Sequence, residues 1–276
     1  SGYTSLWNSL GLMIETHMLK PYPKRVEGTF EMLKTLVNVS HNQKAKIQEA
    51  REQNFQMYSE ADTYPLNFQV DTSNYRRFNF LGYELENLTS EITNLPRIKF
   101  RRDKPFEEEV KYYNQFKPTD SVTIPEAYII PKQWFKVIEL LKWNNISYNR
   151  FGGDTVVEVE EYRIEDFKTR TSAYEGHYLH SDTKVSSKKV KRMYSRGDVL
   201  VKADQPGIRY LIETLEPIAV DSFFNWNFFD SILQKKENFS PYVFEDLAVE
   251  IFENNPKLKA EFEEKRKTDA EFAGNW

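Results

Sequence analysis

Thr155-Val-Val-Glu-Val-Glu-Glu-Tyr162 opens the part of the chain in which the strand signal is strongest, and it sets the expected fold class. Val157 and Val159 lie on one face of an extended chain, and Val156 lies on the other. The pattern therefore predicts a strand without fixing which face is buried. Strand signals continue to residue 203, and Arg196-Gly-Asp198 is predicted as a turn between two further strands.

The neighbouring segments predict more strands, followed by helices. Residues 66–113 are expected to form short strands, and residues 122–130 form one more that ends at Pro131. A helix is expected after Pro131 and should stop at Asn144-Asn145. One face of this helix carries Trp134, Val137, Ile138 and Leu141. From Asp204 onward we expect helix to the end of the chain.

The first sixty residues predict a long helix, from Pro23 to about Glu60. Val26, Phe30, Leu33 and Val37 fall on one helical face, and this apolar stripe is expected to dock on a sheet. Beyond Ser40 the helix is either an exposed continuation or a separate helix. Because proline breaks the helix at Thr63-Tyr-Pro65, we place a domain boundary there. The fold class expected is α+β. Residues 1–62 would hold a terminal strand and long helix, and residues 63–276 a mixed domain with antiparallel strands and a helical C-terminus.

Composition narrows the range of functions. Among the 276 residues, aromatic side chains make up 15%, which favours a packed globular body over disorder. A net charge of -4 argues against a nucleic-acid partner, because phosphate binding needs a basic surface. The basic stretch from Lys184 to Arg196 is interpreted as a solvated strand face. The absence of cysteine excludes disulfides and thiolate metal sites, and no apolar run is long enough for a membrane span.

Glu15 is the candidate catalytic residue. It follows the apolar residues Leu12, Met13 and Ile14, which are expected to form a strand just before the long helix. A carboxylate at such a strand end is partly removed from water, which suits it to act as a general base. The alternative is that Glu15 is an exposed glutamate in a loop.

Several motifs resemble a bacterial branch of zinc carboxypeptidases, the carboxypeptidase A-like metallopeptidases. Glu15-Thr-His-Met-Leu-Lys-Pro-Tyr22 followed by Arg25-Val-Glu27 is similar to the end of their peptidase domain, and later segments resemble the extension behind it. Those segments are Pro125-Glu-Ala-Tyr-Ile-Ile-Pro131, Tyr174-Glu-Gly-His177, Leu215-Glu-Pro217 and Asp221-Ser-Phe-Phe-Asn-Trp-Asn-Phe-Phe229. The resemblance implies that Glu15 is the base that activates a zinc-bound water, and that residues 1–62 end an α/β peptidase domain.

The zinc ligands of that family are missing here. Its members bind zinc through a His-x-x-Glu pair and a second histidine, all upstream of the catalytic glutamate. The histidines of this chain are His17, His41, His177 and His180, and none is followed by Glu three residues later. We therefore expect the C-terminal part of a larger peptidase, inactive alone and without bound zinc, whose partners in the parent protein are a peptide substrate and its own N-terminal peptidase region.

The resemblance also implies export, to the periplasm, the cell surface or the medium. Two alternatives stay open at this point. Residues 63–276 could be a non-catalytic module that binds a partner, cell-wall component or glycan, or that braces the peptidase domain. The parent protein could also be an inactive pseudopeptidase.

Four further features of the sequence are possible sites. His17 is either a substrate contact or a hydrogen-bonded structural histidine. His177 and His180 could not chelate one ion from a strand, because residues three apart point to opposite faces. Glu216 is expected to end a helix. The aromatic run at residues 223–229 is expected to be core rather than a ligand groove or docking face.

Overall fold

The computed structural model describes residues 2–234 and 240–274. Helix and strand occur in nearly equal shares, 35% and 33%, and the strands pair in antiparallel sheets, which confirms the α+β class. The helix expected at residues 235–239 and at the last two residues lies outside the described residues. Two compact units are present, Ser1–Phe229 and Asp230–Trp276, and each is described by itself.

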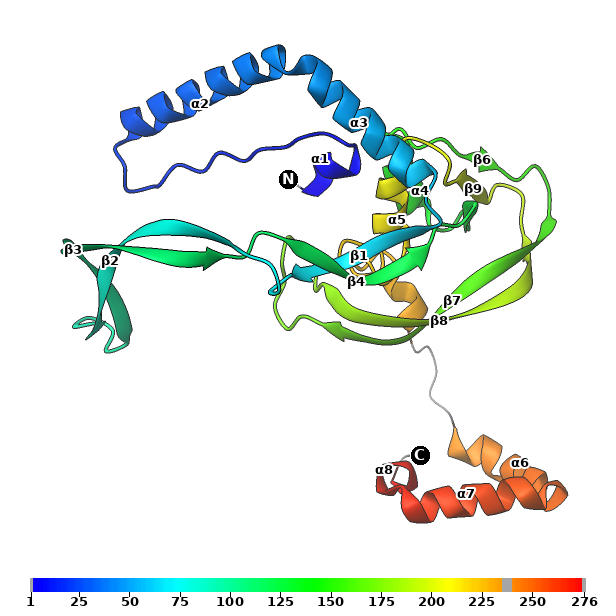
Figure 1. Ribbon diagram of the computed structural model, residues 1–276. Coiled ribbons are helices and arrows are strands. Elements are labelled where there is room, and N and C mark those ends of the chain that lie inside the picture. Colours follow the sequence, from blue (N-terminus) through cyan, green and yellow to red (C-terminus); the bar gives the residue numbers. More distant parts are fainter. Residues whose placement is uncertain (1, 235–239, 275–276) are drawn as a thin grey trace. The chain divides into compact units, whose positions relative to one another are not determined.

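The first unit contains both long hairpins and most of the helices (Figure 1). Its helices are α1 (Gly2–Leu6), α2 (Tyr22–Asn42), α3 (Lys44–Ser59), α4 (Phe135–Trp143) and α5 (Ile208–Leu215). Its strands are β1 (Thr63–Val70), β2 (Arg76–Thr89), β3 (Pro96–Tyr112), β4 (Phe116–Thr123), β5 (Ala127–Ile130), β6 (Asn149–Arg150), β7 (Thr155–Thr169), β8 (His180–Tyr194) and β9 (Val199–Lys202). The sheets have the orders β1-β4, β2-β3, β5-β9-β6 and β7-β8.

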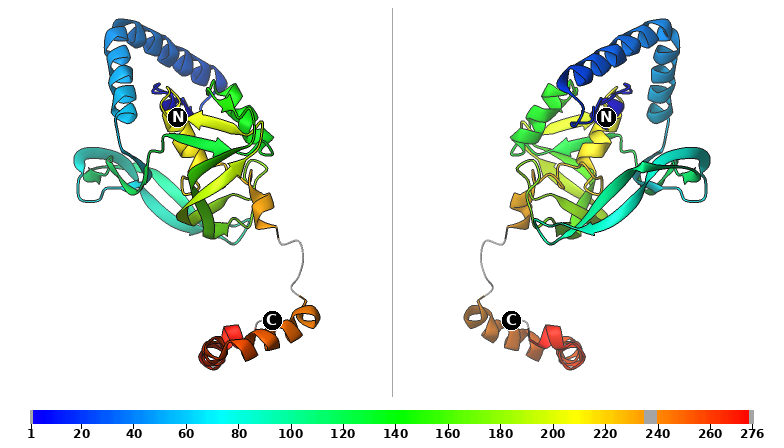
Figure 2. Two further views of the ribbon diagram at one scale, coloured as in Figure 1. Left: turned by 90° about the vertical axis from the view of Figure 1, so that its right-hand side faces the viewer. Right: turned by 90° about the vertical axis from the view of Figure 1, so that its left-hand side faces the viewer.

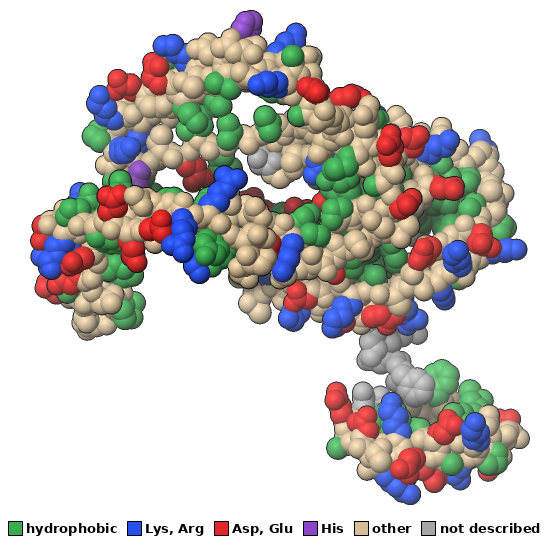
Figure 3. All heavy atoms as spheres, in the orientation of Figure 1, with side chains coloured by type: hydrophobic (Ala, Val, Ile, Leu, Met, Phe, Trp, Pro, Cys, Tyr) green, Lys and Arg blue, Asp and Glu red, His purple; other side chains and the backbone are tan. Residues whose placement is uncertain are grey.

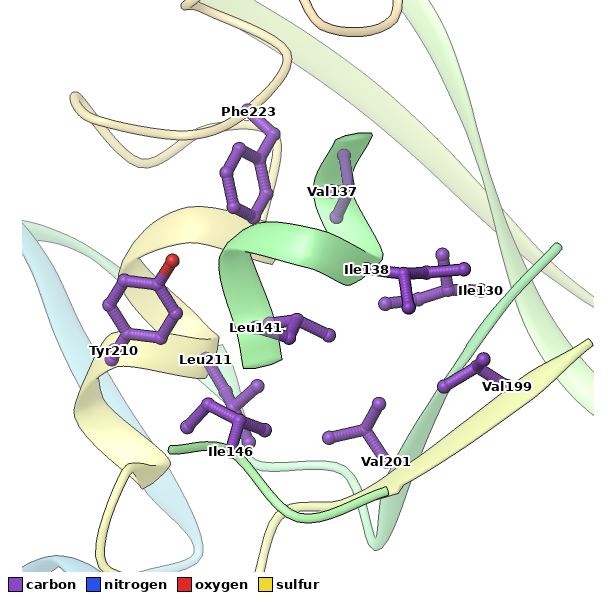
Figure 4. Close-up of a cluster of buried hydrophobic side chains, with 10 residues drawn as sticks. All are labelled: Ile130, Val137, Ile138, Leu141, Ile146, Val199, Val201, Tyr210, Leu211 and Phe223. Atoms are coloured by element: carbon purple, nitrogen blue, oxygen red, sulfur yellow. The ribbon is translucent and has the colours of Figure 1, made fainter. Parts of the chain in front are cut away.

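The main core forms where α4 packs on the three-stranded sheet (Figure 4). Val137, Ile138 and Leu141 point from α4 toward Val199 and Val201 of β9, and all five are buried. The apolar face predicted for α4 is thus confirmed, and the helix ends at Trp143, directly before the expected stop. Burial of these aliphatic side chains stabilises the unit by removing apolar surface from water.

A second, smaller core joins β1 to α5. Tyr64 and Leu66 of β1 are buried against Ile208 and Ile212 of α5, with Ala219 completing the cluster. The two cores share α5, since Leu211 and Tyr210 belong to the first core. Helix α5 therefore connects the three-stranded sheet with the β1-β4 sheet.

The β7-β8 hairpin explains the basic stretch noted in the sequence. The register sets Glu158 opposite Lys191 and Glu160 opposite Lys189, and Lys184 forms an ion pair with Asp166 at 3.0 Å. Opposite charges facing each other across two strands stabilise the pairing. The interpretation of residues 184–196 as a solvated strand face is confirmed, because its basic side chains are exposed. The turn at Arg196–Asp198 is also confirmed, and Gly197 supplies its positive φ of 93°.

Two predictions about the N-terminal part are wrong, and one open alternative is decided. Residues 9–17 form neither helix nor strand, because no strand pairs with them. Of the two alternatives for the chain beyond Ser40, the separate helix is present: α2 ends at Asn42, α3 begins at Lys44, and the two differ in direction (Figure 2). The stripe on α2 does not dock on a sheet within the described residues, and Phe30 and Leu33 are exposed.

The segment after α5 also departs from the prediction. Residues 216–229 form successive turns rather than a helix, because Pro217 follows the C-cap residue of α5, Glu216, and cannot continue the helix. The expectation that the aromatic run is core is confirmed for Phe223 and Phe224, which are buried. Phe228 and Phe229 are partly buried and pack against the main core.

The second unit contains the 3-10 helix η1 (Asp230–Leu233) and the helices α6 (Pro241–Asn254), α7 (Pro256–Thr268) and α8 (Ala270–Ala273). Helices α6 and α7 each begin with proline, which is favoured in the first turn. The ring of Phe262 lies 5.1 Å from that of Phe252 and 5.4 Å from that of Phe272. These three rings join the helices α6, α7 and α8.

Replacing Leu141 with alanine tests whether α4 is the centre of the fold. Leu141 is 0% exposed, so Leu141→Ala should lower the free energy of unfolding by about 2–5 kcal/mol through lost burial and a cavity. Trp143→Ala on the same helix is the control, because Trp143 is 72% exposed and its loss should cost under about 1 kcal/mol. Urea unfolding measures both. Equal losses for the two variants would contradict this core.

Candidate functional site

Glu15, the predicted base, lies in the unpaired segment between α1 and α2. Its side chain is exposed, and so are those of Leu12 and Met13, which precede it. The expected apolar strand behind Glu15 is therefore absent, and within the described residues this carboxylate is not removed from water. Glu15 alone has no geometry for catalysis here.

His17 lies at the turn that leads into α2 and is exposed. Its ring atom Nδ1 accepts a hydrogen bond from the backbone N–H of Leu19 at 3.2 Å. The backbone N–H of Lys20 donates to the carbonyl oxygen of His17 at 3.1 Å. These bonds give His17 a local role in the turn and leave its Nε2 atom accessible for a further contact.

The start of the same segment is firmly anchored. Trp7 stacks on Tyr210 of α5 with ring centroids 5.8 Å apart. A Cβ atom at Gly207 would lie 3.2 Å from the Trp7 ring and 2.2 Å from Ile146, so only glycine permits this close approach. The chain is therefore held on the core as far as Trp7 and leaves it before Glu15.

Arg209 is the most connected polar side chain of the unit. Its Nη1 atom donates to the carbonyl oxygen of Ser5 at 2.6 Å, to Asn8 Oδ1 at 3.2 Å and to Asn54 Oδ1 at 3.3 Å. Its guanidinium also lies over the ring of Tyr58, 4.8 Å from the centroid. One side chain on α5 thus holds the N-terminal segment and α3.

Arg209 also belongs to a half-buried cluster with Tyr64 and Glu213. The Tyr64 hydroxyl donates to Glu213 Oε1 at 3.0 Å and accepts from Arg209 Nε at 3.3 Å. Burial raises the pKa of Tyr64 and that of Glu213, although the Tyr64 hydrogen bond and the Arg209 charge oppose the shift for Glu213. Both charged groups of the cluster have hydrogen-bond partners, so we assign it a structural role.

Glu216 is a buried carboxylate, 2% exposed, at the end of α5. Tyr128 of β5 donates its hydroxyl to Glu216 Oε1 at 2.7 Å, and Tyr162 of β7 is a second hydrogen-bond partner. Burial raises the pKa of Glu216, and both tyrosine hydrogen bonds oppose that shift. The expected helix-ending role is confirmed, since Glu216 is the C-cap residue of α5 and its backbone is extended, with φ of -77° and ψ of 117°. The side chain additionally ties β5 and β7 to α5.

The remaining histidine pair does not form a metal site. His180 is buried, and its Nδ1 atom lies 2.9 Å from Thr169 Oγ1, while the ring contacts Phe167 and Phe224. His177 lies in a turn and contacts the rings of Trp226 and Phe228. Across residues 2–234 and 240–274, no group of three His, Cys, Asp or Glu side chains could hold a metal ion. The residues present therefore do not fit a zinc site.

Exposed apolar side chains lie before and after Glu15 in the chain. Figure 3 shows hydrophobic side chains on the side of α2 that faces the preceding segment. The exposed apolar residues from this region include Leu10, Leu12, Met13, Met18, Leu19, Val26, Phe30, Leu33 and Val37.

Comparisons with known proteins give no independent assignment. No protein-family model, no curated protein and no solved structure matches the chain. Separately, none of the helices in the described part of the chain is long and apolar enough to cross a membrane.

Sequence reasoning missed the role of Arg209 and the burial of Glu216. Arg209 had a signal in the sequence, because it is a single charge beside the apolar residues Ile208, Tyr210 and Leu211. Such an isolated charge must find partners when its helix is buried. Their partners come from segments more than fifty residues away, which no local pattern identifies.

The buried carboxylate makes a pH-dependent prediction. Because the pKa of Glu216 is raised in the folded protein, its charged form destabilises the fold at neutral pH, and this cost disappears as pH falls through the folded pKa. Glu216→Gln keeps an oxygen that accepts from Tyr128 and removes the charge. It should therefore be more stable than the parent chain at pH 7 and lose that advantage near pH 4.

Thermal unfolding of both proteins across this range measures the effect. Glu216→Ala is the second variant, and it should be less stable at every pH by about 1–3 kcal/mol for each tyrosine hydroxyl left without its acceptor. A Gln variant that is less stable at neutral pH than at pH 4, relative to the parent, would contradict the assignment.

Proposed function

We propose that this chain is the C-terminal part of a zinc metallocarboxypeptidase and that Glu15 is the general base for peptide-bond hydrolysis in the parent protein. The proposal begins from the resemblance of residues 15–22 and of the later motifs to that family. The zinc ligands belong to the peptidase region upstream, because the described residues do not fit a zinc site. In this proposal the chain is inactive alone, and the resemblance implies that the parent protein is exported.

The observation that carries the proposal is the uncovered apolar surface on both sides of Glu15. Leu12 is 66% exposed and Leu33 is 52% exposed, and each belongs to a longer apolar run. A concentration of exposed apolar residues is typical of a binding face. We assign that face to the N-terminal peptidase region, which would remove Glu15 from water and give the carboxylate the environment of a general base.

The alternative of a bracing or binding module is favoured by a different observation. The β2-β3 hairpin carries exposed apolar side chains along its length: Phe78, Phe80, Leu85, Ile98 and Phe100. An isolated two-stranded hairpin is only marginally stable in water, so these side chains indicate a packing partner. In the peptidase proposal this hairpin braces the catalytic region, and in the alternative it binds a separate partner.

Glu15→Gln in a longer protein that includes the upstream region tests the catalytic role. Loss of the proton acceptor should lower kcat for hydrolysis of a C-terminal peptide bond by about 100-fold or more, with the protein still folded. Glu31→Gln, an exposed glutamate on α2, should leave kcat unchanged. Turnover that survives in the Glu15 variant would remove Glu15 from the mechanism.

Leu33→Glu tests, independently of activity, whether the upstream peptidase region covers the apolar stripe of α2. In the chain of 276 residues Leu33 is exposed, so the free energy of unfolding should change by no more than about 0.5 kcal/mol. In the longer protein the same change would bury a charge at an apolar contact and should cost about 2 kcal/mol or more. Asn38→Glu, which lies off the apolar stripe of the same helix, is the control. Equal effects of Leu33→Glu in the two proteins would argue against a covered stripe.

A further inference from the structure

A surface pocket of about 240 Å³ lies between α4 and the residues at β6, away from Glu15 in the sequence. Ile138, a buried residue of the main core, forms part of its wall. Three cationic side chains line it: Lys132, Lys142 and Arg150. Glu139 contributes a single carboxylate. The pocket therefore carries an excess of positive charge, although the chain as a whole is acidic.

Two of the cations are held in place by consecutive carbonyl groups. Lys132 Nζ donates to the carbonyl oxygen of Arg196 at 3.0 Å, and Arg150 Nη1 donates to that of Gly197 at 2.7 Å. The turn itself is fixed by buried Asp198, which accepts from the backbone N–H of Lys132 at 2.8 Å. Neutral carbonyl groups thus orient both cations without neutralising them.

The positive charge of the pocket is not balanced within the described chain. Among residues 2–234 and 240–274, Lys132, Lys142 and Arg150 form no ion pair. The basic side chains of β8, by contrast, face acidic residues of β7. Cations gathered without a carboxylate partner repel one another, and an anion placed between them relieves that repulsion.

The pocket also offers aromatic walls. Phe135 is 60% exposed at its rim, and the ring of Tyr148 lies beneath the Arg150 guanidinium at 5.7 Å from the centroid. A planar apolar group can pack on these rings while a charged group reaches the cations. The pocket therefore favours a ligand that carries both a planar apolar group and an anionic group.

We propose that this pocket binds a small organic anion, in which a phosphate or carboxylate group is joined to a planar apolar group. Lys142 and Arg150 contact the charged group, Lys132 adds positive potential, and Tyr148 and Phe135 pack on the apolar part. The site is open, so its affinity is modest and decreases as salt concentration rises. It does not depend on the peptidase proposal.

An NMR titration of the ¹⁵N-labelled chain with phenyl phosphate tests the site, with inorganic phosphate and phenol as the separate halves of the probe. Phenyl phosphate should shift the amide signals of Phe135, Glu139 and Arg150, with a Kd on the order of 1 mM, and should bind more tightly than either half. Lys142→Gln should raise this Kd about tenfold. Lys142 is the best position to change, because it lines the pocket and forms no ion pair within the described part of the chain.

Lys136→Gln is the matched control, since Lys136 lies on the same helix and does not line the pocket. It should leave the Kd unchanged. The proposal is overturned if phenyl phosphate shifts no signal near the pocket, or if the Lys142 and Lys136 variants weaken binding equally. Tight binding of phosphate with no gain from the phenyl group would also overturn the assigned ligand class.

Discussion

Arg209 connects the N-terminal segment, α3 and β1, which are distant from one another in the sequence. From one position on α5 it binds the backbone of Ser5, the side chains of Asn8 and Asn54, and the hydroxyl of Tyr64. The Tyr64 hydroxyl accepts a hydrogen bond from Arg209 and donates one to Glu213. The nearby carboxylate of Glu213 offsets the Arg209 charge at this partly buried junction. Because these contacts cross the division expected at residue 62, the N-terminal segment and the β-rich part are coupled through α5.

That coupling fixes the chain on both sides of the segment that contains Glu15. The chain is fixed on the core at Ser5 to Asn8, and the next fixed point is α3, which Arg209 contacts at Asn54 and Tyr58. Everything between these anchors, including Glu15, His17 and the stripe of α2, makes few contacts and exposes apolar side chains. An anchored segment with an apolar face suits a region that is completed by a second body of protein.

The sequence predicted well those features that depend on local pattern. The face of α4, the turn at Gly197 and the antiparallel strands all follow from residue spacing and turn chemistry, and each is present. The strand before Glu15 was wrong because a short apolar run becomes a strand only when another strand pairs with it. The helix expected at residues 216–229 was wrong because Pro217 and the burial of Phe223 and Phe224 determine that segment, whereas the helices expected nearer the C-terminus are present as α6, α7 and α8.

The candidate site was less accessible to sequence reasoning. Glu15 and His17 were identified as a motif, but their surroundings depend on contacts that no spacing within this chain specifies. The burial of Glu216 depends on Tyr128 and Tyr162, which lie 88 residues and about fifty residues away in the chain. Long-range partners of this kind decide whether a carboxylate is catalytic, structural or simply solvated.

Zinc content, measured by elemental analysis, tests the central claim most directly. The chain of 276 residues and a longer protein that includes the upstream region would be purified and measured in the same run. We expect zinc only in the longer protein, close to one ion per chain. Zinc in neither protein would contradict the peptidase assignment and favour a binding module or pseudopeptidase. Stoichiometric zinc in the shorter chain would contradict the conclusion that its own residues do not fit a zinc site.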